Sequence, residues 1–480
     1  MKDSGPLTTR RQNLALITLI VAAALEIIDL TIVNVALPAI ASDLSAQPEA
    51  VQWVVAGYAL SFALLLMAGG RLGDSFGYRR MFLWGVAGFT LTSMSCGLAQ
   101  SPEQLVGARL LQGAAGAIMS PQVLALMQVM FSPLERVSKL ALFGLIGGLA
   151  AIAGPVIGGM LIEANLFGLG WRLIFLINLP IGLLALGSGW YFLPNSRSSQ
   201  PAGFDMIGMI LCGGAVLGLV WPLTRAEAGW GWLEVLCLAA VPPLLTWGWR
   251  HVARRVEAKR AALFHPALLA NLTFRLGLGI AVAFAAANAG FLLTFAFALQ
   301  SERGETALTT GLLHMPFGLG AMGGIALLVR NLLPRFGKRV LVWGAATMML
   351  AVAAVLSGIG ALALSWPALV PILVVAGLGM GAASGCVAPI SVAQVDRNHA
   401  GAASGLLKTA QHVGAALGIA LAGSAYFAWG AERQIPPSLA AAAVICGLLA
   451  CCIWLGVMLP ERIFAPALAP NPAKEPLMPL

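Results

Sequence analysis

Two carboxylates, Glu26 and Asp29, lie three residues apart inside the first of many long apolar stretches. At this spacing both fall on one face of a helix. A charge near the centre of a bilayer costs roughly 3 kcal/mol on insertion scales, so acids at that depth indicate a function. Burial disfavours the ionised carboxylate and a nearby cation favours it, so such a group can hold a proton in one state and release it in another. We expect Asp29 to exchange protons, and Glu26 to assist it, to contact a cationic substrate or to face the outer mouth.

Arg109 is a basic side chain within another apolar stretch, and Gln112 follows it by about one helical turn. An unpaired guanidinium at that depth would be very costly, so we expect Arg109 to face the interior and to find an acid, amide or carbonyl partner. Gln112 can share those partners. Two roles stay open for Arg109: a proton relay with Asp29 and a purely structural ion pair.

Several other polar and aromatic residues of the apolar stretches are candidates for a substrate cavity, although packing would explain each of them alone. Lys408 and His412 are spaced i, i+4, and we expect Lys408 to extend to the cytoplasmic face while His412 lies deeper. The candidates for the cavity are Asn34, Gln52, Trp53, Gln112, Asn288, Phe291, His314 and His412.

These groups need elements that hold them within a bilayer. Of the 480 residues, 59% are hydrophobic and only 10% are charged, whereas a soluble domain is about 25% charged. A spanning helix needs about 20 apolar residues, and helix is favoured because backbone polar groups must be satisfied internally and no segment alternates like a barrel strand. We expect an all-α polytopic fold with 14 transmembrane helices at about 14–40, 50–70, 79–99, 104–130, 138–162, 171–193, 204–223, 232–250, 274–299, 309–330, 338–361, 367–390, 401–429 and 438–459.

The basic residues indicate how these spans are oriented. With the N-terminus inside, most of the 28 Lys and Arg residues fall in cytoplasmic segments, as the positive-inside rule requires. Both termini are then cytoplasmic, and the protein is expected in the cytoplasmic (inner) membrane. The net charge of +9 is therefore a topological signal, and no nucleic-acid partner is expected. The basic residues of the outer loops are Arg172, Arg225, Arg303 and Arg433.

An internal repeat predicts two related halves. Segment 72–79 shares leucine, phenylalanine, glycine and arginine with segment 332–339, and segment 136–144 matches 397–405 at nearly the same offset. Parallel halves with a binding site between them are a transporter architecture. The expected division is a cytoplasmic N-terminus 1–13, a six-helix half 14–193, a linker with two additional helices 194–250, a cytoplasmic loop 251–273, a second six-helix half 274–459 and a cytoplasmic tail 460–480.

The loop between the second and third spans resembles the signature loop of the major facilitator superfamily and reads Gly70-Arg-Leu-Gly-Asp74-Ser-Phe-Gly77-Tyr-Arg79-Arg80. Its glycines would let two helix ends approach closely, and its acid and arginines would form a cytoplasmic charge network that breaks and reforms as a gate. Ser75 stands where a basic residue is usual, and Pro334 replaces the acid in the second copy. We therefore expect an asymmetric gate.

Other segments resemble the fourteen-span drug:proton antiporters of that superfamily. They are Asp29-Leu-Thr-Ile-Val-Asn34-Val-Ala-Leu-Pro38, Arg109-Leu-Leu-Gln112-Gly113, Trp171-Arg-Leu-Ile-Phe-Leu-Ile-Asn178-Leu-Pro180 and the antiporter motif Gly154-Pro155-Val-Ile-Gly158-Gly159, with Ala150 at a position that is often glycine. The antiporter motif favours close packing with a bend between the halves, either as a seal against proton leak or as simple helix packing. The resemblance implies proton-coupled efflux of lipophilic or cationic compounds, of the multidrug and antibiotic-resistance type, with the proton as coupling ion and no other cofactor.

Other classes of function fit the sequence less well. An ATP-driven pump would need a Gly-x-x-x-x-Gly-Lys-Ser/Thr loop, which does not occur. A membrane enzyme would need clustered catalytic groups, but the histidines are scattered and the seven cysteines lack metal-ligand spacing. Export of one endogenous metabolite and uptake by symport stay open, because the fold serves both directions. The expected partners are a small-molecule substrate and the lipid bilayer; a periplasmic adaptor in a Gram-negative host is a further option that no residue here indicates.

Overall fold

The computed structural model describes residues 9–198, 203, 205–226, 229–361, 364–396, 399–429, 435–461 and 463, which form helices and no strand. Among them, 12 helical segments are long and apolar enough to cross a membrane. The expected all-helical, multi-pass fold is therefore confirmed. Helices α3 and α16, with 20 and 30 residues, fall outside that set of 12. Residues 1–8, Arg397, Arg433 and most of the tail beyond 461 lie outside the described residues.

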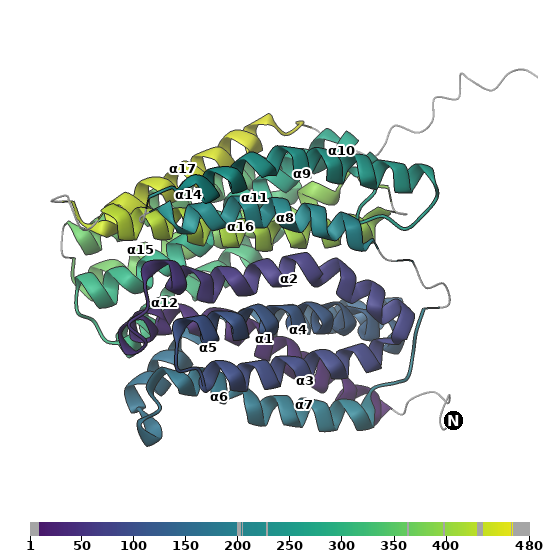
Figure 1. Cartoon of the computed structure of the whole chain (residues 1–480), viewed down its shortest axis with the longest axis horizontal. Coiled ribbons are helices and arrows are strands. Elements are labelled where there is room, and N and C mark those ends of the chain that lie inside the picture. Colours follow the sequence, from purple (N-terminus) through teal and green to yellow (C-terminus); the bar gives the residue numbers. More distant parts are fainter. Residues whose placement is uncertain are drawn as a thin grey trace, which may run out of the picture.

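The first half of the chain forms one bundle, drawn in purple and blue (Figure 1). Its elements are α1 (Thr9–Asp43), α2 (Pro48–Phe76), α3 (Tyr78–Gly97), α4 (Pro102–Met130), α5 (Pro133–Ala164), the 3-10 turns Leu166–Gly168 and Gly170–Arg172, α6 (Leu173–Leu176) and α7 (Asn178–Phe192).

Along the chain, a helical pair follows this bundle and precedes the second one: α8 (Met206–Thr224) and α9 (Trp232–Glu257). The second bundle, coloured from teal through green to yellow in Figure 1, consists of α10 (Ala267–Ala270), α11 (Leu272–Phe297), a π segment Ala298–Glu302, α12 (Ala307–Gly323), a π segment Gly324–Val329, α13 (Arg330–Phe336), α14 (Arg339–Gly360), α15 (Trp366–Val392), α16 (Ala400–Trp429) and α17 (Pro437–Met458).

Two seams join the bundles. Along one, α5 packs on α12, and along the other, α2 packs on α16. The inserted helix α8 lies beside α9 and also contacts α2 and α16, so the inserted pair runs along the second seam. We call the end of the molecule where α1 begins and α17 ends the terminal end, at the right of Figure 1, and the other the opposite end.

Several expected helix bounds differ from the observed ones. The sixth span, expected as one helix over 171–193, is interrupted between α6 and α7, because Pro180 has no N–H to bond the carbonyl of Leu176. The tenth span passes through a π segment. Helix α9 continues to Glu257, so the expected loop 251–273 begins as helix, since polar residues can extend a helix beyond the apolar core.

The backbone supports the repeat detected in the sequence. Gly77, between α2 and α3, has φ 99°, and Gly337, between α13 and α14, has φ 54°. Both values lie in the region that glycine adopts without steric cost. Each of the two matching segments therefore turns at a glycine with positive φ, although the ψ values of 135° and −130° differ.

Candidate functional site

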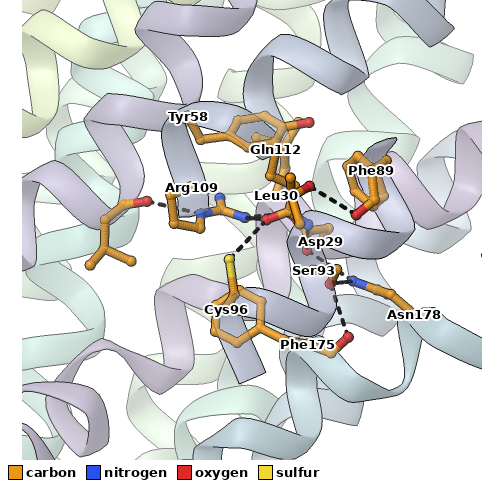
Figure 2. Close-up of polar contacts among 12 residues, drawn as sticks. Asp29, Leu30, Tyr58, Phe89, Ser93, Cys96, Arg109, Gln112, Phe175 and Asn178 are labelled. Atoms are coloured by element: carbon orange, nitrogen blue, oxygen red, sulfur yellow. Dashed lines mark hydrogen bonds and ion pairs between the residues drawn. The ribbon is translucent and has the colours of Figure 1, made fainter. Parts of the chain in front are cut away.

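Asp29 of α1 and Arg109 of α4 form an ion pair in the interior of the first bundle. The guanidinium Nη1 lies 2.6 Å from the carboxylate Oδ2, and both side chains are fully buried. Figure 2 shows the two groups facing each other between their helices. Sequence reasoning anticipated both residues and their contact.

Two amides complete the hydrogen bonding of the Asp29 carboxylate. Gln112 Nε2 and Asn178 Nδ2 donate to Oδ1 over 2.9 Å and 3.0 Å. Gln112 is the residue predicted to share the partners of Arg109, and its Oε1 accepts from Arg109 Nη1 at 2.7 Å. The carboxylate from α1 thus receives donors from α4 and α7, all without water access.

Sequence reasoning missed two members of this network, Asn178 and Ser93. Asn178 Nδ2 also donates to Ser93 Oγ, which donates in turn to the carbonyl of Phe175, with both distances 2.9 Å. A buried asparagine in an apolar span was the available signal for Asn178. Nothing in the local sequence distinguishes Ser93 from the other serines of α3.

The remaining contacts of Arg109 are weaker or absent. Its Nε donates to the carbonyl of Val54 at 3.0 Å, and the guanidinium carbon lies 4.4 Å from the ring centre of Tyr58. Among the described residues, neither Arg109 Nη2 nor the Tyr58 hydroxyl has a hydrogen-bond partner. Arg109 is therefore anchored on the Asp29 side and has unused donor capacity on the other.

Glu26, one turn before Asp29, belongs to a second charged group, which we call the Lys408 cluster: Glu26, Phe62, Ser120 and Lys408. Lys408 Nζ of α16 donates to Ser120 Oγ of α4 at 3.0 Å and lies 5.3 Å from the ring centre of Phe62. Glu26 is buried and lies near enough to Lys408 and Ser120 to interact with them electrostatically, but it forms no ion pair with Lys408 among the described residues. The expectation that Lys408 extends to the cytoplasmic surface is wrong, because its ammonium finds acceptors across the seam.

A cavity of about 1160 Å³ opens at the terminal end between α2, α4 and α16. Ser120 and Lys408 lie in its lining, with Arg71 and Asp74 nearer the mouth. None of the eight residues predicted as cavity contacts lies in this lining.

Those predicted residues are distributed over the interior. Asn34 donates to the carbonyl of Leu30 in its own helix at 3.1 Å, and Gln52 is buried with its Oε1 unpartnered among described atoms. Trp53 Nε1 donates to Thr224 Oγ1 at 3.0 Å, near the opposite end.

In the second bundle, Asn288 Oδ1 also lacks a partner among the described residues. Phe291 packs between other phenylalanines, and His314 Nδ1 donates to the carbonyl of Thr310 at 2.7 Å. His412 lies beside Phe62, with ring centres 4.3 Å apart, and so adjoins the Lys408 cluster. A role in substrate contact stays a prediction for these residues.

The signature loop sits at the terminal end but forms a different network from the expected one. Asp74 Oδ1 accepts from the Tyr78 hydroxyl at 3.0 Å, and among the described residues it makes no ion pair with the arginines. Arg79 donates to Asn195 Oδ1 and to the carbonyl of Trp190. Arg80 is exposed, and Gly70 has free space around it, since a Cβ there would meet only Pro121 at 3.9 Å.

The antiporter motif of α5 contacts helices on both sides. A Cβ at Gly158 would lie 2.7 Å from Ile32, and one at Gly154 would collide with Thr31, so these two glycines admit α1. A Cβ at Gly159 would lie 2.5 Å from the carbonyl of Ala307, and the carbonyl of Pro155 leaves no room for a Cβ at Gly311. The motif therefore brings α1 and α12 against α5, which fits the predicted close packing between halves.

Asp205, just before α8, organises the terminal end of the inserted pair. Its Oδ1 accepts from the Gly208 amide at 3.0 Å and contacts His251 Nε2 at 2.9 Å, and its Oδ2 accepts from the Leu263 amide at 3.0 Å. Burial acts to raise the pKa of Asp205, but these hydrogen bonds and the nearby Arg255 outweigh it and lower that pKa below its ordinary 3.8. The ionised carboxylate thus ties segment 258–266 to α8 and α9.

Comparison with known proteins identifies relatives along most of the chain. The model of the Major Facilitator Superfamily matches residues 19–419. The chain is 38% identical over 429 residues to the "Probable actinorhodin transporter" of Streptomyces coelicolor, covering 88% of this chain and 74% of that protein. It is 35% identical over 422 residues to the "Tetracenomycin C resistance and export protein" of Streptomyces glaucescens, covering 85% and 74%.

A solved structure shares the architecture at low sequence identity. It is a bacterial homologue of the human lysosomal transporter Spinster in an inward-facing, unoccupied conformation, with a TM-score of 0.64 and 18% identity, covering 95% of this chain and 97% of that one. At that identity the similarity concerns the fold alone.

Proposed function

This chain belongs to the major facilitator superfamily, and we propose that it is a proton-coupled antiporter that exports lipophilic or cationic small molecules, including drugs, across the cytoplasmic membrane. Its relatives carry names of antibiotic transporters and exporters. The observation that carries the proposal is the buried pair of Asp29 and Arg109, with the amides of Gln112 and Asn178 on the same carboxylate.

Proton binding to Asp29 is the proposed coupling step. The ionised carboxylate accepts one charged and two neutral donors. A proton on Asp29 removes the charge that Arg109 neutralises, and leaving a buried charge without its partner costs about 3–5 kcal/mol. Arg109 must then find other acceptors, and its Nη2, which has no partner among the described residues, is available to donate to them. Protonation thus favours a different arrangement of α1, α4 and α7.

Contacts at the opposite end support alternating access from the observed state. Gln300 Nε2 of the second bundle donates to the carbonyl of Val35 in α1 at 3.0 Å, and Thr306 Oγ1 donates to Glu163 Oε2 at 3.2 Å. The cavity, by contrast, lies at the terminal end. We infer that this state receives substrate from the cytoplasm, and that protonation from outside accompanies substrate release.

We further propose the fourteen-span subtype with both termini cytoplasmic. Helix α3 is 20 residues long and lies beside α4 and α7, and α16 lies beside α2, α11 and α17. At 1.5 Å per residue, 20 residues reach about 30 Å, the thickness of the hydrocarbon core. With α3 and α16 added to the 12 candidate spans, both termini lie on one side.

Export of a single endogenous metabolite is the second candidate. The relatives named above are each named for one natural product, which favours a narrow substrate range. Growth inhibition by a panel of antibiotics and dyes, in a deletion strain and an overexpressing strain, separates the two: protection against many compounds supports multidrug export, and protection against one supports the metabolite.

Direction and coupling are tested together in inside-out membrane vesicles, with a compound selected by that panel. Substrate should accumulate when the vesicle interior is acidified and should leave when a protonophore is added. Accumulation driven by the reverse pH gradient would indicate symport instead.

A further inference from the structure

Lys408 occupies a site built from cation acceptors. Its ammonium donates to Ser120 Oγ at 3.0 Å and lies over the Phe62 ring at 5.3 Å. The buried Glu26 carboxylate is near enough for its charge to interact with that of Lys408, although the two form no ion pair among the described residues. A hydroxyl, an aromatic face and a carboxylate are the groups that bind an organic ammonium ion. The acceptors come from α1, α2 and α4, whereas the ammonium comes from α16 in the other bundle.

The position of Lys408 controls access to Glu26. Lys408 and Ser120 lie in the lining of the terminal-end cavity, whereas Glu26 does not and is only 6% exposed. A cationic ligand in the cavity therefore meets the ammonium of Lys408 before it meets the carboxylate. Because lysine is a compact charge on a flexible stem, it can leave this position without unfolding a helix.

Among the described residues, the cavity lining contains two carboxylates of its own, Asp74 near the mouth and Asp205. The buried Asp29 is paired with Arg109. In the lining, Asp205 contacts His251 and Arg255, and Asp74 accepts from Tyr78. The same lining contains three further basic side chains besides Lys408: Arg71, Lys259 and Arg260.

We propose that Lys408 is a tethered cation that competes with cationic substrates for Glu26 and thereby sets the charge preference of the cavity. This inference rests on the proposed export function and narrows its substrate class from lipophilic or cationic compounds to lipophilic compounds that are neutral or anionic. With Lys408 in place, a lipophilic anion is bound more tightly than a cation of the same shape. Without it, Glu26 and the Phe62 face become available to the cation.

The test uses tetraphenylphosphonium and tetraphenylborate, which share size and shape and differ in the sign of their charge. Equilibrium binding of each is measured on the purified full-length protein without a pH gradient. The wild type should bind the borate more tightly. Lys408→Gln should raise the affinity for the phosphonium at least tenfold and lower the affinity for the borate.

Three further variants isolate the mechanism. Lys408→Arg keeps the charge and should keep the wild-type preference. Adding Glu26→Gln to Lys408→Gln should abolish the gain in phosphonium affinity. Lys139→Gln, which removes a lysine of α5 outside the cavity lining, is the matched control and should change neither affinity.

Lys408→Met, which keeps the aliphatic stem, serves as a second neutral variant if Lys408→Gln does not fold. Unchanged or weaker phosphonium binding in a folded neutral variant would overturn the proposal, as would a gain that survives Glu26→Gln. Because no gradient is applied, these results are independent of proton coupling: failure of pH-driven transport alone would overturn the proposed function and leave the role of Lys408 intact.

Discussion

The Asp29 carboxylate is hydrogen-bonded by protein side chains and not by water, so protonation of Asp29 changes contacts between helices. Arg109, Gln112 and Asn178 come from two other helices and approach both carboxylate oxygens. A buried ion pair contributes little net stability, but breaking one partner is costly. The pair is therefore suited to a switch, because a small chemical change at Asp29 alters the interactions of three helices.

The serines of α3 test how firmly this network is organised. Ser93→Ala should lower the thermal stability of the purified protein by the equivalent of about 1–3 kcal/mol. The substitution removes the hydroxyl that accepts one of the two Nδ2 hydrogen bonds of Asn178 and that donates to the Phe175 carbonyl. Ser95→Ala is the matched control, because Ser95 is exposed and bonds only its own helix at Leu91. Equal unfolding temperatures for the two variants would contradict the described network.

The sequence allowed part of this network to be predicted. Asp29, Arg109 and Gln112 are conspicuous because they are polar within apolar stretches, and their mutual contact follows from the cost of burying a charge alone. Ser93 was not predictable, since its partner is more than 80 residues away and a serine is common in such helices. Lys408 was misassigned because its partners belong to the other bundle, which helical spacing cannot indicate.

At the scale of elements, α5 connects the network of α1 to the second bundle. Two of its glycines face α1, and Gly159 faces α12 across the seam. At these three glycines α5 lies so close to its neighbours that an added methyl group would collide with them. Rearrangements of α1 are therefore transmitted to the seam between the bundles.

Gly159→Ala should open this seam, because the new Cβ would lie 2.5 Å from the carbonyl of Ala307. We expect a several-fold faster passive proton leak in liposomes that contain the variant, measured with an enclosed pH-sensitive dye. Gly144→Ala, in the same helix with nothing within 4 Å of the new Cβ, is the control and should leak like the wild type. A Gly159→Ala variant whose proton leak equals that of the wild type would show that the motif is not a seal.

The inserted pair depends on Asp205 at its terminal end. The pKa of Asp205 is lowered in the folded protein from its ordinary 3.8. Its ionised form therefore stabilises the fold at pH values above that ordinary pKa, and the contribution is lost as the pH falls through the folded value. Asp205→Ala should therefore lower the unfolding temperature between pH 8 and pH 5, and the difference from wild type should shrink below about pH 4.

Glu257→Gln provides the comparison for Asp205, since Glu257 is an exposed acid at the end of the same helical pair. The unfolding temperature of Glu257→Gln should equal that of the wild type, within experimental error, at every pH. If Asp205→Ala lowers the unfolding temperature as much at pH 3 as at neutral pH, packing and not the carboxylate charge holds segment 258–266.

At the scale of the whole molecule, two bundles enclose a cavity that is open at one end and lined by basic groups. The protein belongs to a family of transporters and is a transporter, not an enzyme. Composition and periodicity predicted the helical bundle because apolar length is a direct signal of a span. The interruption before α7 and the π segments were not predicted, since both depend on local hydrogen bonding that hydropathy does not report.

Labelling residues at the two ends of α3 tests whether this helix crosses the membrane, as the fourteen-span proposal requires. In a background without the seven native cysteines, Ser75→Cys should react with a membrane-impermeant maleimide only from the cytoplasmic side, and Gln100→Cys only from outside. Both positions are exposed in the structure. If both react from the same side, α3 does not cross the membrane and the fourteen-span assignment is wrong.

The central claim, that a proton on Asp29 drives export, is tested most directly by reconstituting the wild type and Asp29→Asn in liposomes with an imposed pH gradient. We predict that the wild type concentrates substrate against its gradient, whereas Asp29→Asn binds the same substrate yet only lets it equilibrate. Concentrative transport by Asp29→Asn at the wild-type rate would contradict the account.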